Sequence, residues 1–406
     1  MKNVAIVNTG YSGSTGKIAV GLNEYLKRHS YHSHVCQNGD PHIADGDYRI
    51  GNSLDKYLHA FLCRAIGGQG MYSKRATKRF IKHLEEADVD SIFLLNIHEY
   101  FLNEGMLLDY IAMKDIALVY VMIDEYPFLG KCCYNENCMR FKEGCGHCPQ
   151  VSSYPKSLFF DRSREIFKMK GKGYKGIKRC AFVAPEFVVN KAKTSPLMEG
   201  KRLEIVDEAI DVIINKPKDS FELRRALDIG EDKIVIGCVA PYSPKYERKG
   251  VKYLVEAARQ MENDDRFVFV QVGYAMDDKT ALPKNYIPIG YVKNQDLLTM
   301  YYSLADLFVF PSVEDTMPNA CLEALACGSP LLCFNTSGMP FIGDETVMTL
   351  VEPKNVGQMV EVIKATKKKN SNVINTCRNY ALNRYDNQKY YEKLESIMNS
   401  LNHIKV

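Results

Sequence analysis

Hydrophobic residues along the chain fall into short continuous runs separated by longer amphipathic stretches. Such runs are typical of strands that are buried on both faces of a parallel sheet. They occupy residues 4–7, 91–98, 117–124, 233–240, 267–273, 287–292, 307–310 and 330–334. Stretches with helical periodicity lie between or after them, at residues 18–27, 251–258, 296–303 and 380–401. The alternation of strands and helices predicts an α/β protein with Rossmann-like parallel sheets.

The segment from residue 307 to residue 334 has the most specific local pattern. An apolar run is followed by a polar loop with Asp315, by a helical stretch with Glu323 eight positions later, and by a second apolar run. Pro318 suits the first turn of the helix, and Gly328 suits the position just after its end. The pattern predicts a βαβ unit with an acid-bearing loop at the carboxyl end of its first strand.

The start of that helix is predicted to bind an anion. Free N–H groups near Asn319 and Ala320 carry the positive end of the helix dipole, where a phosphate group binds readily. Asp315 and Glu323 would repel the phosphate itself, so we expect them to hold hydroxyl groups. A sugar nucleotide contains both kinds of group. An ordinary βαβ unit with solvated acids is the alternative interpretation.

Residues 305–340 resemble the E-x7-E signature of retaining GT-B glycosyltransferases of the family-four type. The Pro318-Asn319 pair is similar to that of the colanic-acid-like subgroup, which builds bacterial exopolysaccharide and capsule. The resemblance implies two Rossmann-like domains that face a cleft, with a C-terminal helix that crosses back to the first domain. The implied boundaries are residues 1–205 for the acceptor-side domain, 206–380 for the nucleotide-sugar-binding domain and 381–406 for the helix.

The resemblance also implies roles for the two acids. Glu323 matches the Glu that holds the ribose of the nucleotide. Asp315 stands where a Glu usually contacts the donor sugar, and its side chain is one methylene shorter. The backbone that takes the nucleotide base in the family corresponds to Tyr291 and Val292.

Lys249 matches the family's lysine, which neutralises the leaving diphosphate. The arginine expected five positions earlier is replaced by Pro244, so Lys245 or Arg248 would take its part with a different reach. The full set expected to bind the donor is Glu323, Lys245, Arg248, Tyr291, Val292, Pro318, Asn319, Ala320, Gly13, Ser14 and Thr15.

The last three of these residues belong to a glycine-rich turn between the first predicted strand and the first helix. Its spacing is G-x-x-G-x-x-G, which differs from the dinucleotide fingerprint G-x-G-x-x-G and disfavours NAD. In the resembling subgroup this loop lies near the donor phosphates and the acceptor. A tight turn without a ligand is the other interpretation.

Two polar side chains end neighbouring predicted strands of the first domain. His98 and Asp124 lie at carboxyl ends of strands, the usual place for ligands in open α/β sheets. Many relatives carry His-Asp at the second position, where this chain has Ile123-Asp124. Together with Lys249 and Asp315, these two side chains are the candidate catalytic residues.

Five cysteines lie close together in the loop at residues 132–148. Four of them, two in a C-x-x-C pair, supply enough thiolates for a tetrahedral structural zinc site. An Fe–S cluster needs the same ligands, and free thiols or a disulfide are the simpler alternatives. The four expected ligands are Cys132, Cys138, Cys145 and Cys148.

Composition and charge narrow the functional classes. The 406 residues suffice for two domains, and the net charge of +4 is too small to indicate a nucleic-acid partner. No apolar run reaches the ~18 residues of a membrane span, and the apolar start is too short for a signal peptide. Several of the 13 cysteines fall in predicted buried elements, which favours a reducing cytosol.

The basic stretch at 162–179 indicates either a solvated helix or contact with anionic lipid headgroups at the inner face of the plasma membrane.

The resemblance therefore implies a retaining, metal-independent hexosyltransferase. It would move a hexose from a nucleotide-diphosphate sugar to a growing, lipid-linked bacterial surface glycan, with no cofactor for the chemistry. The departures at Ile123, Pro244 and Asp315 keep two alternatives open. One is a catalytically silent subunit that scaffolds a partner enzyme. The other is a sugar-nucleotide epimerase with His98 or Asp124 as acid or base.

Overall fold

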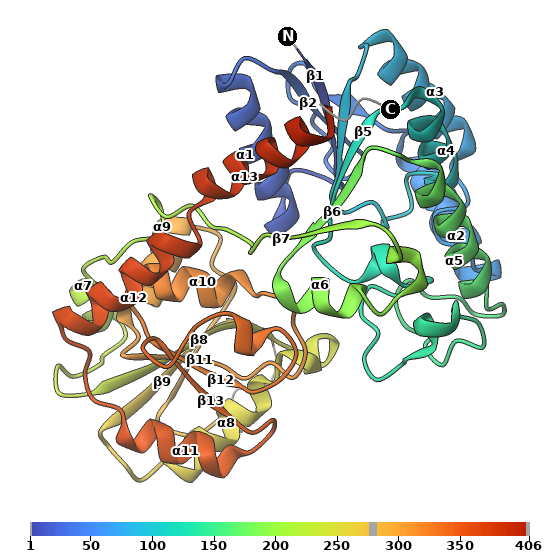
Figure 1. Ribbon diagram of the computed structural model, residues 1–406. Helices are drawn as coiled ribbons and strands as arrows, with labels where there is room; N and C mark the ends of the chain where they lie inside the picture. Colours follow the sequence, from blue (N-terminus) through green and yellow to red (C-terminus); the bar gives the residue numbers. More distant parts are fainter. Residues whose placement is uncertain (1, 276–281, 403–406) are drawn as a thin grey trace. The chain divides into compact units, whose positions relative to one another are not determined.

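The structure is a computed structural model that describes residues 2–275 and 282–402, with the backbone alone for residues 244 and 245. The chain forms two compact units (Figure 1). The first unit contains Met1–Val206 and Tyr391–Val406, and the second contains Asp207–Tyr390.

The first unit is built on a seven-stranded parallel sheet with the order β3-β2-β1-β4-β5-β6-β7. Each strand is short, and the central strands β4 and β5 are buried throughout, as their continuous apolar runs predict. The strands are β1 (Asn3–Val7), β2 (His32–Gln37), β3 (Tyr48–Arg49), β4 (Ser91–Leu94), β5 (Ala117–Val121), β6 (Cys180–Ala184) and β7 (Arg202–Ile205).

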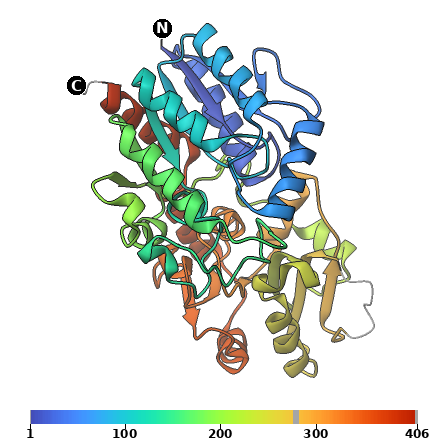
Figure 2. The same ribbon diagram turned by 90° about the vertical axis from the view of Figure 1, so that its right-hand side faces the viewer.

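Helices cover the faces of this sheet. They are α1 (Gly13–Arg28), α2 (Ser53–Ile66), α3 (Lys74–Glu86), α4 (Glu104–Lys114), α5 (Ser163–Gly176) and α6 (Glu186–Ala192). Helices α4 and α5 lie side by side (Figure 2). They approach closely because Gly173 has no side chain: a β-carbon there would lie 2.7 Å from the side chain of Leu108.

The C-terminal helix α13 (Asn387–Asn402) crosses back to the first unit, as the sequence predicted. Glu395 accepts hydrogen bonds from the hydroxyls of Tyr25 at 2.9 Å and Tyr31 at 2.8 Å. Lys2 donates to Asn399 at 2.9 Å. These contacts attach the end of the chain to β1, α1 and the turn that follows α1.

The second unit has a six-stranded parallel sheet with the order β10-β9-β8-β11-β12-β13. Its strands are β8 (Ile234–Tyr242), β9 (Phe267–Tyr274), β10 (Tyr286–Ile289), β11 (Leu307–Phe310), β12 (Leu331–Phe334) and β13 (Met348–Val351). Its helices are α7 (Phe221–Ala226), η4 (Pro244–Lys249), α8 (Val251–Gln260), α9 (Gln295–Leu304), α10 (Asn319–Ala326), α11 (Val356–Ala365) and α12 (Ser371–Arg384). The order 3-2-1-4-5-6 is that of the Rossmann fold, so the predicted fold class is confirmed.

The strand order reverses once in each sheet. In the first unit the reversal lies between β1 and β4, and in the second it lies between β8 and β11. Ligands of open α/β sheets bind beyond the carboxyl ends of the strands at this switch point. The loops after these four strands are therefore where each unit is expected to bind a ligand.

Several predicted element bounds were wrong. The strand expected at 117–124 ends at Val121, and the helix expected at 380–401 is divided between α12 and α13. Two other differences have a local reason. The first helix begins at Gly13 and not at residue 18, so the glycine-rich segment forms its first turn. Strand β4 ends at Leu94 and not at residue 98. The backbone N–H of Asn96 donates to the side chain of Asn8 at 3.1 Å, so the chain leaves the ladder there.

Candidate functional site

Side chains from two neighbouring loops form the centre of the candidate site in the second unit. Lys249 ends η4 after β8, and Asp315 lies in the loop after β11. Nζ of Lys249 is 2.5 Å from Oδ2 of Asp315, and Nη1 of Arg248 is 3.4 Å from the same oxygen. Asp315 is buried. Three of the predicted site residues therefore meet at the switch point of this sheet.

Two glycines allow the loops to pack this closely. Gly250 has a φ of +66°, and a β-carbon there would lie 1.8 Å from the carbonyl oxygen of Pro311. At Gly338 a β-carbon would lie 1.5 Å from the carbonyl oxygen of Thr316, and its N–H donates to the carbonyl of Asp315 at 2.9 Å. A side chain at either position would push apart the loops that bring Lys249 and Asp315 together.

Glu323 lies on α10 and is buried. The hydroxyl of Tyr302, on α9, donates to Oε2 of Glu323 at 2.7 Å. Burial and the facing carboxylate raise the pKa of Tyr302 well above its ordinary value, so the hydroxyl stays protonated and remains a donor. This hydrogen bond orients the Glu323 carboxylate within the second unit.

Helix α10 begins one residue later than the sequence predicted, because Pro318 is its N-cap and Asn319 its first residue. The first turn contains no acidic side chain. The Oδ1 atom of Asn319 is buried and has no hydrogen-bond partner among the described residues, and Ala320 beside it is half-buried. A buried acceptor without a partner is costly, and a hydroxyl or N–H group of a ligand would satisfy it.

The other predicted donor-binding residues are less enclosed. Tyr291 and Val292 follow β10, and the side chain of Tyr291 is 82% exposed while that of Val292 is half-buried. Lys245 lies within η4, and its side chain is outside the described part of the chain. The structure therefore brings Arg248 and Lys249 to Asp315, and among the described residues no hydrogen bond or ion pair links Tyr291 or Val292 to them.

In the first unit the structure brings the two predicted polar residues together. Asp124 Oδ2 lies 2.8 Å from Nε2 of His98, and the Tyr154 hydroxyl lies 3.2 Å from Nδ1 of the same ring. Oδ1 of Asp124 accepts from the N–H of Tyr126 at 2.9 Å. Both His98 and Asp124 are buried, and they follow the adjacent strands β4 and β5.

The environment of His98 favours its charged form. Burial lowers the pKa of His98, but the facing Cys133 sulfur and Asp124 carboxylate raise it by more, so the pKa lies well above its ordinary value. We assign most of this increase to Asp124, because burial raises the pKa of the Cys133 thiol and keeps that thiol neutral. An imidazolium paired with a carboxylate is a poor general base near neutral pH, which disfavours His98 as the base of an epimerase.

The glycine-rich turn lies at the carboxyl end of β1, beside the switch point of the first sheet. Gly13, Ser14 and Thr15 form the first turn of α1, which contains no acidic residue and has no side-chain cap. Gly13 and Ser14 are exposed and Thr15 is half-buried. Backbone N–H groups at such a helix start suit an anion.

The four loop cysteines line one small cavity together with Phe141. A hydrogen bond from the Cys132 thiol lowers the pKa of Cys148 to about 7. Sulfur atoms that share a zinc ion at about 2.3 Å lie about 3.8 Å apart. Among the described residues, however, no three of the four sulfur atoms of Cys132, Cys138, Cys145 and Cys148 form a set within 4.8 Å of one another. The cysteines share a cavity but are not arranged as a closed zinc site.

One part of the lipid-contact prediction for residues 162–179 was wrong. Lys170, on α5, is fully buried, and Nζ donates to the carbonyls of Tyr126 at 2.6 Å and Leu129 at 3.2 Å. It also lies 3.2 Å from the centre of the Tyr126 ring. Lys170 is therefore an internal support for the loop after β5. The exposed basic residues of this stretch are Arg164, Lys168, Lys172, Lys175 and Lys178.

The sequence reasoning missed an exposed apolar surface on α2. Its side chains recur at helical spacing, a pattern that normally marks a buried face. The loop at 158–160 lies against the end of this helix, because the N–H of Leu158 donates to the carbonyl of Arg64 at 2.7 Å. We call this surface the α2 patch; it consists of Leu54, Tyr57, Leu58, Phe61, Leu158, Phe159 and Phe160, each more than half exposed.

Two Rossmann-like units, each with one parallel sheet, define a class of protein, the GT-B fold. Its likeness to a known structure extends over the whole chain. HepE from Anabaena, solved with UDP-glucose, superposes with a TM-score of 0.63 at 13% identity, covering 98% of this chain and 100% of that one. At this identity the likeness establishes the fold alone.

Sequence comparison finds a family match within the second unit. Residues 233–367 match the family model Glycosyl transferases group 1. The matched range runs from the residue before β8 to just beyond α11 and contains Lys249, Asp315 and Glu323. The resemblance noted in the sequence is thereby confirmed.

Two curated relatives are similar to this chain over a longer range than the family model. WcaC of Escherichia coli (strain K12), provisionally named a colanic acid biosynthesis glycosyl transferase, is 24% identical over 272 residues, which cover 63% of this chain and 64% of WcaC. The UDP-Gal:alpha-D-GlcNAc-diphosphoundecaprenol alpha-1,3-galactosyltransferase of Escherichia coli is 27% identical over 229 residues, which cover 52% of this chain and 55% of that enzyme. The chain thus spans less than two thirds of the length of each relative.

Proposed function

We propose that this protein is a retaining glycosyltransferase that moves a hexose from a nucleotide-diphosphate sugar to a growing, lipid-linked bacterial surface glycan. The observation that carries the proposal is the meeting of Lys249, Arg248 and Asp315 at the switch point of the second sheet, with Glu323 on the helix that follows. The names of the two relatives support a polysaccharide product, and that of the galactosyltransferase supports a lipid-diphosphate acceptor.

In this proposal the cations of the site act on the leaving group. Negative charge grows on the diphosphate as the bond to the sugar breaks. Lys249 and Arg248 neutralise that charge together with the positive end of α10, so the chemistry requires no metal ion. The paired carboxylate of Asp315 holds the two cations in place before the donor binds.

The acids hold the neutral parts of the donor. Asp315 accepts from a hydroxyl of the sugar once the diphosphate has taken over its cations, and Glu323 accepts from the ribose hydroxyls. The hydrogen bond from Tyr302 fixes the orientation of the Glu323 carboxylate. Such carboxylate–hydroxyl bonds are charge-assisted and stronger than those between neutral groups.

The first unit has polar groups of its own at the switch point of its sheet. The first turn of α1, with Gly13, Ser14 and Thr15, offers N–H groups to a phosphate. Asp124, held in one orientation by His98 and by the N–H of Tyr126, is available to a sugar hydroxyl and stands beside Ile123, where relatives have a histidine.

A catalytically silent subunit is the second candidate, and one observation favours it. Asp315 already binds Lys249 and Arg248, so a nucleotide must displace a short ion pair to reach these cations. A subunit that binds nucleotide sugar but never transfers the sugar would have the same fold and the same match to the family model.

The first experiment is a thermal-shift panel of UDP, GDP, ADP and CMP with their common sugars. A ligand at 100 times its dissociation constant should stabilise the protein by ~2.7 kcal/mol. We expect one diphosphate class to shift the unfolding temperature and the shift to be lost in Glu323→Ala and Lys249→Ala. Lys252→Ala, an exposed lysine one turn further on, is the matched control. No shift with any nucleotide would contradict the proposal, and binding without transfer would favour the silent subunit.

We also propose that the α2 patch docks on an anionic membrane surface, where a lipid-linked acceptor would be found. Exposed aromatic and aliphatic side chains enter the interface, while Arg64 and Lys168 face the headgroups. Within residues 2–275 and 282–402, no helix has the length and apolar character needed to cross a bilayer.

A structural zinc ion in the cysteine loop is the least supported part of the proposal. The shared cavity and the contact between Cys132 and Cys148 favour it, and the spread of the sulfur atoms opposes it. The loop is fixed without an ion, since Nζ of the buried Lys131 donates to the carbonyls of Gln150 at 2.9 Å, Ser153 at 3.0 Å and Pro155 at 2.7 Å. Zinc content of the purified chain, compared with that of Cys145→Ser, tests the prediction.

A further inference from the structure

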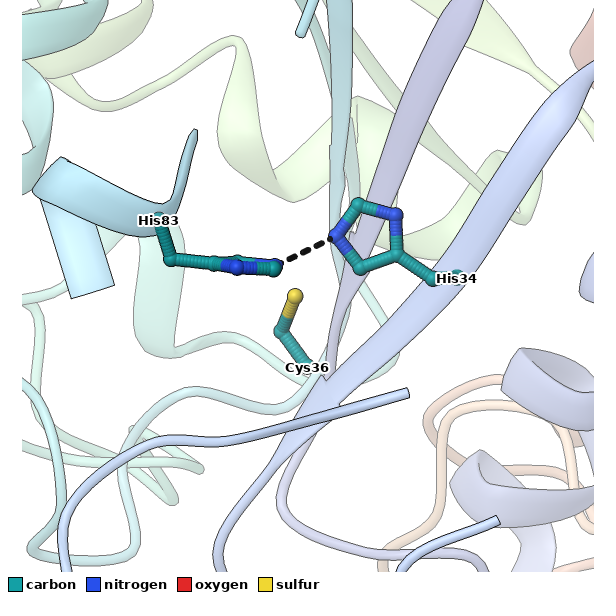
Figure 3. A group of neighbouring side chains, drawn as sticks. All are labelled: His34, Cys36 and His83. Atoms are coloured by element: carbon teal, nitrogen blue, oxygen red, sulfur yellow. Dashed lines mark hydrogen bonds between the residues drawn. The ribbon is translucent and has the colours of Figure 1, made fainter. Parts of the chain in front are cut away.

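Three side chains with metal-binding atoms meet between strand β2 and helix α3, outside the site already described (Figure 3). His34 and Cys36 are two positions apart on β2, so strand alternation places them on the same face of the sheet. His83 reaches them from α3. Its Nε2 atom lies 3.1 Å from Nε2 of His34. One nitrogen of each ring and the Cys36 sulfur all lie within 4.8 Å of one another.

The spacing of the two nitrogens is close to that of two ligands on one ion. Imidazole nitrogens bind zinc at about 2.0–2.1 Å, and at a tetrahedral angle two of them lie about 3.4 Å apart. The observed separation of 3.1 Å differs from this by a few tenths of an ångström. A hydrogen bond between two neutral imidazoles also explains the distance, but it does not account for the thiol that faces both rings (Figure 3).

The protonation states suit a metal. Burial, with a smaller effect from His83, lowers the pKa of His34 to about 4, and burial lowers the pKa of His83. Both rings are therefore neutral near pH 7, which is the form that binds metals. Cys36 is fully buried, and burial raises the pKa of its thiol, so an arriving cation would displace a proton and the resulting thiolate would be neutralised by the ion.

The residues around His34, Cys36 and His83 restrict the three side chains, and a surface hollow beside His34 gives an ion access to them. Tyr48, the partner of Cys36 in the β2–β3 ladder, stacks on the His83 ring at 3.9 Å between centres and 12° between planes. Asp47 accepts from the N–H of Val35, between the two strand ligands, at 2.8 Å and adds negative charge nearby. His34 also borders a surface hollow lined by Tyr31 and Ala87, through which an ion can enter.

The geometry points to a transition-metal site formed by Nε2 of His34, Nε2 of His83 and Sγ of Cys36. Two imidazoles and a thiolate suit zinc and the softer divalent ions and disfavour magnesium and calcium. The three ligands leave the fourth tetrahedral position to water or to a small ligand from the hollow. Binding releases the thiol proton and ties β2 to α3, without changing the oxidation state of any group.

A second close set of ligand types, His98, Asp124 and Cys133, is not assigned in this way. Nε2 of His98 already binds Asp124 at 2.8 Å. The Cys133 sulfur lies 3.6 Å from both ring nitrogens, so it faces the side of the ring and not one nitrogen's lone pair. This set belongs to the site described above.

The test is a cobalt(II) titration of the full chain that carries Cys145→Ser and Cys148→Ser, which removes two of the four expected thiolate ligands of the competing loop site. We expect one Co²⁺ per chain, with a thiolate charge-transfer band in the near ultraviolet and visible bands typical of a tetrahedral site. Zinc should displace the cobalt and abolish the bands. The same titration of the unsubstituted chain shows whether the two cysteine substitutions themselves disturb the site.

His83→Phe removes one ligand and retains a ring that stacks on Tyr48, so it separates metal binding from folding. We expect it to weaken Co²⁺ binding by more than about 100-fold, beyond the 10–100-fold typical for loss of an outer hydrogen-bond partner. Cys36→Ala should abolish the charge-transfer band. His32→Gln, an exposed histidine on the same strand, should leave both unchanged.

Absence of the charge-transfer band from both the unsubstituted and the loop-substituted chain would overturn the assignment. A band that survives in both His83→Phe and Cys36→Ala would also overturn it, because the ion would then be bound elsewhere. Circular dichroism of each variant verifies that the fold is retained. None of these results depends on whether the protein transfers a sugar.

Discussion

Lys249 and Asp315 form an ion pair, Nζ to Oδ2 at 2.5 Å, between the loops that follow the adjacent strands β8 and β11. The pair places a cation and an anion where a diphosphate and a sugar would lie side by side. Because each charge satisfies the other, the loops can keep this arrangement without a ligand. The ion pair also means that a bound diphosphate must compete with Asp315 for Lys249.

This competition predicts opposite effects of Asp315→Asn on binding and on turnover. Loss of the carboxylate frees Lys249 and Arg248 and removes repulsion, so a nucleoside diphosphate should bind several-fold more tightly. Transfer should fall by about 100-fold or more, because a preorganised contact with the sugar is lost. Isothermal titration with the diphosphate and a steady-state transfer assay measure the two effects. Weaker diphosphate binding in Asp315→Asn would contradict the proposed competition.

Lys249→Ala should lower kcat/KM by about 10²–10³-fold, the usual cost of removing one preorganised group that stabilises growing charge. The loss should appear mainly in kcat, since the charge on the leaving diphosphate is greatest in the transition state. Lys252→Ala serves as the control. Equal activity of the two variants in a transfer assay would exclude Lys249 from the leaving-group site.

Tyr302→Phe tests whether the orientation of Glu323 matters for the donor. The substitution removes one hydrogen bond to a carboxylate, worth about 1.5–3 kcal/mol, while the ring continues to fill its buried position. We expect the KM for the donor to rise by about tenfold with little change in kcat. Tyr301→Phe, at the neighbouring and nearly buried position, should leave the KM unchanged. A fall in kcat alone would show that Glu323 acts on the reacting sugar and not on the ribose.

The sequence was sufficient for the features that depend on local pattern. Short apolar runs predicted the alternation of strands and helices, and strand ends and motif spacing indicated His98, Asp124, Lys249 and Asp315 as candidate residues. The structure adds that His98 contacts Asp124 and that Lys249 contacts Asp315. These relationships follow because parallel strands that are adjacent in a sheet end at the same edge.

The sequence did not predict which side chains of a helix point into the protein and which point to the solvent. Lys170 lies in a strongly basic stretch, yet it is buried because carbonyl groups of the loop after β5 replace its water. His83 also belongs to a basic helix, and only the fold brings it to His34 and Cys36. The α2 patch has the spacing of a core face, and only the structure shows that nothing among the described residues covers it.

Lys369 should make the stability of the protein rise in mildly alkaline solution. Burial lowers the pKa of Lys369 to about 8, and Nζ donates to the carbonyl of Ser303 and to Oγ of Ser329, each at 2.8 Å. Between this value and about 10.4, the unfolded chain holds the proton more tightly than the folded chain does, so the free energy of unfolding increases with pH. Below pH 8 the full cost of burying the charge is present.

The measurement is the difference in unfolding free energy between the parent and Lys369→Met from pH 7 to pH 10. Across this range, the unfolding free energy of the parent should rise by about 2 kcal/mol relative to that of the variant. This figure is reduced because the side chain is partly exposed to solvent. Lys367→Met, an exposed lysine on the same segment, controls for general alkaline effects. A parent and a Lys369→Met variant with parallel pH profiles would show that Lys369 stays charged in the fold.

Phe61 and Phe159 should control membrane binding if the α2 patch enters a lipid interface. Their side chains are 64% and 75% exposed, and transferring each ring out of water is worth about 1.5–3 kcal/mol. Phe61→Ser with Phe159→Ser should therefore reduce sedimentation with vesicles of anionic phospholipid by well over tenfold. Ile213→Ser, which removes an equally exposed apolar side chain from the second unit, should bind as the parent does. Binding of the parent should also weaken with salt and on neutral vesicles, because Arg64 and Lys168 contribute through their charge. A double variant that binds like the parent, or a parent that binds neither kind of vesicle, would refute the membrane contact without affecting the donor site.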